Sequence, residues 1–235
     1  MIDTLLFDLD DTLVAYEAVT DVSWRQACGT LLSPDLVPLE TACQTIQKHS
    51  SRYWSDEERS RAGRQDMVSA RRAIVGSAFE ELGLPEEQAV QVADLFSKVR
   101  IDNMYVLPGA VETLSRFQAK GLKMALITNG DSAGQRAKIS RFGLARFFSS
   151  VLIEGELGIG KPDPRVFREA MRQLDSESRH ALMVGDNLIW DVEGARAVGI
   201  RGVWFNWKKA PLPIGVVPHA VITELPELID VVRQT

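Results

Sequence analysis

The sequence contains little cysteine: Cys28 and Cys43 are the only two among 235 residues, and they form no CxxC pair. This scarcity argues against a disulfide framework and favours a reduced, cytoplasmic location. No apolar run approaches the roughly 18–20 residues that a membrane helix requires. Carboxylates also interrupt the N-terminal segment where a signal peptide would be apolar. We therefore expect neither a secretion signal nor a membrane partner.

An excess of positive charge is also lacking, since 27 Lys and Arg residues stand against 32 Asp and Glu, a formal net charge of −5. This balance argues against nucleic acid as a partner. The rest of the composition, 45% hydrophobic and 25% charged, is that of an ordinary globular protein. A chain of this length is expected to form one large domain, or a core with a smaller second unit.

Short apolar runs that predict buried strands recur along the chain, the first of them over residues 4–9. Further strands are predicted over 123–128, 150–153, 181–185, 202–205 and 220–222, and helices over 131–142, 163–174, 190–198 and from about 224. Strands that alternate with helices in this way are typical of right-handed βαβ units. The sequence therefore predicts an α/β fold, with a Rossmann-like parallel sheet covered by helices on both faces.

Residues 16–104 differ in character from the rest of the chain. Helical spacing dominates there, β-branched runs are absent, and helix starts are predicted at Ser33-Pro34, at Asp66 and at Pro85. We expect about four helices in this segment. The predicted organisation is a core formed by 1–15 and 105–235, with an all-helical insertion over 16–104 after the first strand.

Polar residues follow the first predicted strand, at the edge where parallel α/β sheets bind ligands. Asp8, Asp10 and Thr12 stand there. Two carboxylates that face one site repel each other unless a cation lies between them or one holds a proton. A polar turn with a helix cap is the alternative interpretation of the same residues.

The later strand ends carry further polar motifs. Residues 127–130, Ile-Thr-Asn-Gly, form a turn whose glycine frees backbone N–H groups for an anion. Two glycines and two prolines fix the backbone around Lys161. Asp186 stands at the tip of the 181–185 strand, and Asp191 follows about one helical turn later, so both carboxylates can face the same side. Each motif taken alone also fits an ordinary turn or helix cap.

The ordered set DLDDTL, ITNGD, GKPDP and GDNLIWD resembles the four motifs of the haloacid dehalogenase-like (HAD) hydrolase superfamily, and the insertion over 16–104 resembles the helical cap of that superfamily. ITNGD and the strand end at 204–206 look loosely like the group that contains N-acylneuraminate-9-phosphatase and pyrimidine nucleotidases. The resemblance implies a Rossmann-like catalytic core and a Mg²⁺-dependent phosphatase. Its substrate would be a small sugar, nucleotide or related metabolite phosphate, hydrolysed through an aspartyl-phosphate.

The resemblance also implies catalytic roles. Asp8 would be the nucleophile, and Asp10 would protonate the leaving alcohol and later activate water. Thr12 would orient Asp10 and its loop. Lys161 would neutralise Asp8 and the transferring phosphoryl group.

The resemblance further implies how metal and phosphate are bound. Thr128 and the backbone N–H of Asn129 would hold phosphate oxygens, together with Lys161. The implied ligands of Mg²⁺ are Asp8, the main-chain carbonyl of Asp10, Asp186 and Asp191, the last directly or through water or Asn187. All of these are oxygen ligands, which suit a hard octahedral cation rather than zinc.

Particular residues argue against two other activities of the superfamily. Dehalogenases lack the second aspartate, so the presence of Asp10 argues against dehalogenation. Phosphonate hydrolysis requires a cap lysine, and the insertion has only Lys48 and Lys98. A phosphomutase with the same core chemistry remains an alternative, as does a non-catalytic module that binds a phosphorylated ligand.

Substrate discrimination is expected to come from the insertion or from core loops that face it. Residues 51–72 combine six arginines with Tyr53 and Trp54. Arginine forks and aromatic faces suit the hydroxyls, carboxylates or bases of sugar and nucleotide phosphates. The six arginines are Arg52, Arg59, Arg61, Arg64, Arg71 and Arg72.

Overall fold

The computed structural model describes all residues, 1–235, and divides them into two compact units. Unit 1 consists of Met1–Ala15 and Tyr105–Thr235, and unit 2 of Tyr16–Met104. The two ends of unit 1 at this boundary are paired, because the N–H of Ala15 donates to the carbonyl of Tyr105 at 2.9 Å. None of the helices combines the length and the apolarity needed to span a membrane.

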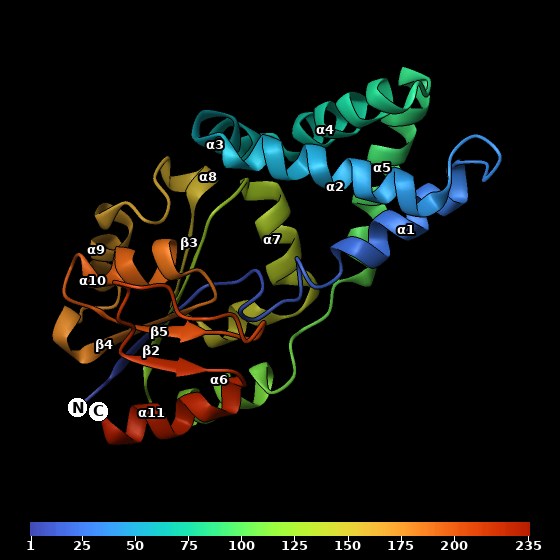
Figure 1. The fold of residues 1–235 in the computed structure, drawn as a ribbon. Helices are drawn as coiled ribbons and strands as arrows, with labels where there is room; N and C mark the ends of the chain where they lie inside the picture. Colours follow the sequence, from blue (N-terminus) through green and yellow to red (C-terminus); the bar gives the residue numbers. More distant parts are fainter. The chain divides into compact units, whose positions relative to one another are not determined.

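Unit 1 contains a six-stranded, all-parallel sheet in the order β3-β2-β1-β4-β5-β6 (Figure 1). The strands are β1 (Thr4–Phe7), β2 (Lys123–Thr128), β3 (Ser150–Ile153), β4 (Ala181–Gly185), β5 (Arg201–Phe205) and β6 (Ala220–Ile222). Every residue of β1 and β4 is buried, which explains why these strands are continuous apolar runs in the sequence. The predicted α/β fold is confirmed, and four strands have the predicted bounds.

Helices cover the sheet of unit 1 on both faces (Figure 1). They are α6 (Ala110–Ala119), α7 (Ser132–Arg141), α8 (Glu154–Leu157), α9 (Pro164–Gln173), α10 (Gly194–Arg196) and α11 (Leu228–Gln234). Phe167 of α9 packs with Leu6 of β1 and Ala125 of β2 in one buried cluster. Because side chains alternate along a strand, Leu5 and Phe7 point to the opposite face, where Phe7 meets Phe148 edge to face.

Unit 2 is all helical, as predicted. Its helices are α1 (Thr20–Leu31), α2 (Leu39–Ser55), α3 (Glu57–Gln65), α4 (Met67–Leu82) and α5 (Glu86–Asn103). A single apolar cluster joins four of them, and within it the ring of Trp24 stacks on Phe96 at a centroid distance of 3.4 Å. The predicted helix starts at Asp66 and Pro85 are confirmed, since these residues are the N-caps of α4 and α5.

One predicted helix start is wrong, one helix was missed, and one predicted helix differs in type and bounds. No helix starts at Ser33-Pro34, because residues 33–38 form a turn and α2 begins after Pro38, whose φ of −60° and missing N–H suit the position before a first turn. Helix α6 was not predicted. The helix predicted over 190–198 is a π-helical turn, Leu188–Glu193, followed by the short α10.

Candidate active site

The candidate site lies at the carboxyl ends of β1 and β4, which are neighbours at the point where the strand order reverses. Parallel α/β sheets bind ligands in the crevice at such a point. Asp8 directly follows β1, and its N–H still donates to the carbonyl of Val184 in β4 at 2.9 Å. Asp186 directly follows β4. Carboxylate oxygens of Asp8, Asp186 and Asp191 all lie within 4.8 Å of one another.

Asp191 is brought into this cluster by the turn that follows β4. The side chain of Asn187 accepts hydrogen bonds from the N–H groups of Ile189 and Trp190 at 3.0 and 2.9 Å, which starts the π-helical turn. The N–H of Asn187 then donates to Oδ2 of Asp191 at 3.0 Å. Gly185 makes room, because a Cβ at this position would lie 2.1 Å from the same oxygen. The local sequence therefore requires glycine at the strand tip.

Lys161 supplies the buried cation of the site. Its Nζ lies 2.5 Å from Oδ1 of Asp8 and 2.6 Å from Oδ1 of Asp191. The amide of Asn129 holds the lysine backbone in place, accepting from its N–H and donating to its carbonyl, both at 2.8 Å. The Asn129 side chain therefore positions Lys161.

Burial dominates the electrostatics of the cluster. It raises the pKa of Asp8 to about 7, against the opposing attraction of Lys161. Burial, followed by repulsion from Asp8 and Asp191, raises the pKa of Asp186 to about 9. Burial alone would lower the pKa of Lys161, but Asp191 and Asp8 outweigh it and raise that pKa above its ordinary value. The single positive charge of Lys161 therefore does not balance the three carboxylates of Asp8, Asp186 and Asp191.

The donor set fits Mg²⁺. Every candidate ligand is an oxygen, as a hard divalent cation requires, and no histidine or cysteine belongs to the cluster. The carboxylate of Asp186 makes no hydrogen bond or ion pair in the structure, although its backbone N–H and carbonyl do. This carboxylate is available to a cation beside Asp8 and Asp191.

Thr12 contacts a different residue from the one predicted. Its buried hydroxyl donates to Oδ2 of Asp8 at 3.0 Å and accepts from the N–H of Asp186 at 3.1 Å. It therefore orients Asp8 rather than the side chain of Asp10. The carboxylate of Asp10 lies outside the three-carboxylate cluster and is bonded by Lys138.

Two residues of α7 complete the site and were not found from the sequence. Gln135, only 3% exposed, donates to Oδ2 of Asp10 at 3.0 Å and also bonds the hydroxyl of Thr128. Lys138 contacts both oxygens of Asp10 at 2.7 Å. One signal could have pointed to Gln135: it stands four residues before the buried Ile139, and this spacing puts a polar residue on the inner face of the helix.

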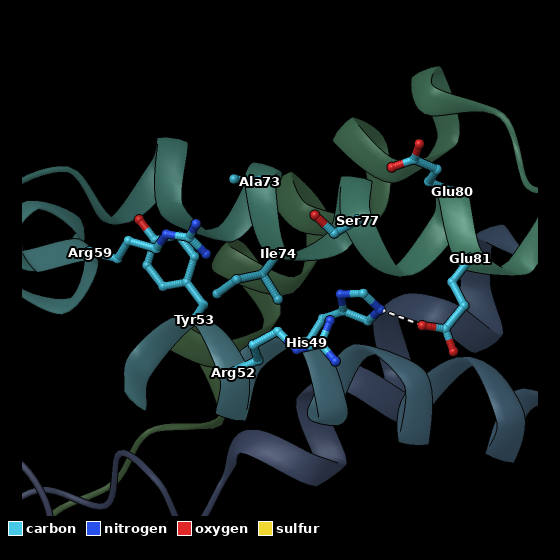
Figure 2. A pocket seen from close by; sticks show the side chains of 9 residues that line it. All are labelled: His49, Arg52, Tyr53, Arg59, Ala73, Ile74, Ser77, Glu80 and Glu81. Atoms are coloured by element: carbon cyan, nitrogen blue, oxygen red, sulfur yellow. Dashed lines mark hydrogen bonds and ion pairs between the residues drawn. The ribbon is translucent and has the colours of Figure 1, made fainter. Parts of the chain in front are cut away.

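Unit 2 has a pocket of about 660 Å³ between side chains of α2, α3 and α4 (Figure 2). Its lining residues are His49, Arg52, Tyr53, Arg59, Ala73, Ile74, Ser77, Glu80 and Glu81. Two of the six arginines of 51–72 thus lie at this pocket. Arg72, in contrast, is engaged in a two-pronged ion pair with Asp94 at 2.7 and 2.9 Å.

Comparison with known proteins agrees with this geometry. The model of the haloacid dehalogenase-like hydrolase family matches residues 2–199. A glyceraldehyde 3-phosphate phosphatase of Pyrococcus furiosus is 30% identical over 99% of this chain and 94% of its own length. A phosphoserine phosphatase of Thermus thermophilus is 41% identical, in a match that spans 67% of this chain and 63% of that protein. The pyrimidine 5′-nucleotidase YjjG of Escherichia coli is 27% identical over 96% of both chains.

A solved structure shares the fold. The HAD-hydrolase YfnB of Bacillus subtilis, solved with bound magnesium, superposes with a TM-score of 0.78 at 22% identity and covers 98% of both chains. The chain belongs to the haloacid dehalogenase-like hydrolase family. The predicted family with its helical cap and the predicted class, a phosphatase acting on phosphoric monoesters, are confirmed. Family membership and the aspartate cluster together support the predicted cofactor, Mg²⁺.

Proposed function

We propose that this protein hydrolyses a small phosphomonoester in two steps, through a phosphoryl group carried on Asp8. One observation carries the proposal. The buried carboxylate of Asp8 has Lys161 on one oxygen and Thr12 on the other, within reach of two further carboxylates. A carboxylate fixed in this way is an oriented nucleophile, and it needs no cofactor beyond a metal ion.

In the first step, an oxygen of Asp8 bonds to phosphorus while the bond from phosphorus to the leaving oxygen breaks. Asp10 gives that oxygen a proton, so an alcohol departs. In the second step, a water oxygen bonds to phosphorus and the bond to Asp8 breaks. Asp10 takes the proton of the water, and inorganic phosphate is released. Each step thus returns Asp10 to the state that the other step requires.

The remaining residues of the site would bind the substrate phosphate and the metal ion. Thr128 and the backbone N–H of Asn129 would hold phosphate oxygens beside Lys161. Asp8, Asp186 and Asp191, with the main-chain carbonyl of Asp10, would hold Mg²⁺. When bound, the ion supplies positive charge that offsets the carboxylates and the substrate phosphate.

The proposed substrate is a sugar, nucleotide or related metabolite phosphate. Relatives named for glyceraldehyde 3-phosphate, phosphoserine and pyrimidine nucleotides support this range. In the proposal, unit 1 is the catalytic core and unit 2 is the cap. The predictions that nucleic acid and membranes are not partners, and that the protein is cytoplasmic, form part of the same proposal.

A panel of sugar, nucleotide, amino-acid and glycolytic phosphates, assayed by phosphate release with and without Mg²⁺, tests the function. We expect turnover of at least one small ester, loss of activity with excess chelator, and recovery on adding Mg²⁺. Asp8→Asn should be inactive on every ester, including a generic aryl phosphate. Activity that survives exhaustive chelation, or near-normal turnover by Asp8→Asn, would contradict the proposal.

A further inference from the structure

The carboxylate of Asp10 is held by two side chains of α7. Nζ of Lys138 lies 2.7 Å from both Oδ1 and Oδ2, and Nε2 of Gln135 donates to Oδ2 at 3.0 Å. A carboxylate oxygen accepts about two hydrogen bonds. Oδ2 is therefore saturated by these two donors, whereas Oδ1 keeps one acceptor position for a proton.

The helix that carries these donors is itself firmly placed. Gln135 and Lys138 are three residues apart, so they share one face of α7. Asp131 caps the helix by accepting from the N–H of Gly134 at 2.7 Å, and Ile139 anchors it with only 2% exposure. Gln135 also donates to the carbonyl of Asn129 at 2.9 Å. Helix α7 thereby links Asp10 to the turn after β2 that is proposed to bind phosphate.

Two lysines contact different carboxylates of the site. Lys161 contacts Asp8 and Asp191, whereas Lys138 contacts Asp10. The side chains of Lys138 and Asp10 are 13% and 23% exposed, so this pair is shielded more than an ordinary surface ion pair. A charge-assisted bond of this kind fixes a carboxylate more strongly than a neutral donor would.

From these contacts we infer that Lys138 is a positioning residue for the second step, in which the carboxylate of Asp10 takes a proton from the attacking water. The inference rests on the proposed function, because it takes Asp10 to be the group that moves protons. The contact of the ammonium with both oxygens holds the carboxylate of Asp10 in one orientation, with a position on Oδ1 left for the proton of the water. The proton moves from water to Oδ1 of Asp10 as the water oxygen bonds to phosphorus and the bond from phosphorus to Asp8 breaks.

Steady-state kinetics on an aryl phosphate test this role. The leaving group of an aryl ester needs little protonation, so kcat/KM reports transfer to Asp8, and kcat reports a slow hydrolysis of the phosphoenzyme. Lys138→Met is expected to lower kcat and KM together by about 10- to 100-fold. The phosphoenzyme should accumulate in acid-quenched samples. Lys138→Arg should recover much of kcat, because a guanidinium can also bond both oxygens.

Two further variants distinguish a failure of the proposed role of Lys138 from a failure of the proposed function. Arg136→Met removes a cation from the same helix, but Arg136 pairs with Glu156 at 2.7 Å, so wild-type kinetics are expected. Asp10→Asn should show the same fall of kcat at constant kcat/KM. If Asp10→Asn lacks this pattern, the proposed function is wrong. If Asp10→Asn shows it while Lys138→Met keeps wild-type kcat, or loses kcat/KM as much as kcat, the role of Lys138 is overturned.

Discussion

The ammonium of Lys161 lies 2.5 Å from Oδ1 of Asp8, although 153 positions separate the two residues in the chain. Their side chains are 2% and 10% exposed, so water screens the pair little. Lys161 bonds a second carboxylate, Asp191, at 2.6 Å. Lys161 is therefore the buried cation that Asp8 and Asp191 share.

Lys161→Met should lower kcat by about 100-fold or more, because it removes the cation that offsets charge on the nucleophile and the phosphoryl group. The free energy of unfolding of the metal-free protein should also fall, by up to roughly 3–5 kcal/mol, since Asp8 and Asp191 lose their partner. Urea titration in chelator measures the second effect. Wild-type turnover together with wild-type stability would contradict this account of Lys161.

Gly185→Ala should disrupt the site through packing alone. A Cβ at Gly185 would lie 2.1 Å from Oδ2 of Asp191, so the strand tip or the carboxylate must shift. We expect a loss of roughly 1–3 kcal/mol in unfolding free energy, together with weaker Mg²⁺ binding measured by calorimetry. Gly76→Ala is a matched control, because nothing lies within 4 Å of its Cβ position on α4. Unchanged Mg²⁺ affinity in Gly185→Ala would argue against Asp191 as a ligand.

Acid should weaken the contact between α7 and α8. The guanidinium of Arg136 bonds both oxygens of Glu156 at 2.7 and 2.8 Å and, with Ser132, lowers the pKa of that carboxyl to about 2. A lowered folded-state pKa gives stability that is present above about pH 4.5 and is lost as the pH falls towards 2. Arg136→Met should therefore lower the free energy of unfolding slightly at pH 7, by less than about 1 kcal/mol for this exposed pair, which thermal unfolding measures. The difference from wild type should shrink between pH 5 and pH 3, and a difference that grows with acid would contradict the assignment.

Arg52 and Arg59 are the arginines of 51–72 that line the pocket of unit 2 (Figure 2), and their guanidinium groups make no hydrogen bond or ion pair. Arg52→Ala and Arg59→Ala should raise KM for the preferred ester while leaving aryl phosphate turnover unchanged. Arg72→Ala is the control, because Arg72 is engaged by Asp94. If both pocket variants keep the wild-type ranking of substrates, this segment does not select the substrate.

The sequence predicted the residues at strand ends because a parallel sheet brings those ends together. Asp8 and Asp186 follow buried apolar runs, and adjacency of β1 and β4 is enough to make them neighbours. Lys161 and Asp191 were found from the glycines, prolines and spacing around them. Strong local patterns thus located most of the site.

Contacts that depend on how a helix turns against the sheet could not be predicted. Lys138 lies within a helix whose sequence looks solvated, and only the path after β2 directs it to Asp10. Thr12 was expected to orient Asp10, but a turn with positive φ at Asp11 leads its hydroxyl to Asp8. The missed helix α6 follows Gly109 without a side-chain cap, so no start signal marked it.

The central claim is that Asp8 carries the phosphoryl group, and trapping the intermediate tests it most directly. Asp10→Asn, mixed with an aryl phosphate and Mg²⁺, should form the phosphoenzyme faster than it hydrolyses it. Mass spectrometry of the acid-quenched protein should then show the addition of one phosphoryl group, and fragmentation should place it on the peptide that contains Asp8. The double variant with Asp8→Asn should remain unmodified. A phosphoryl group on any other residue, or turnover of the ester without a phosphoenzyme that involves Asp8, would contradict the account.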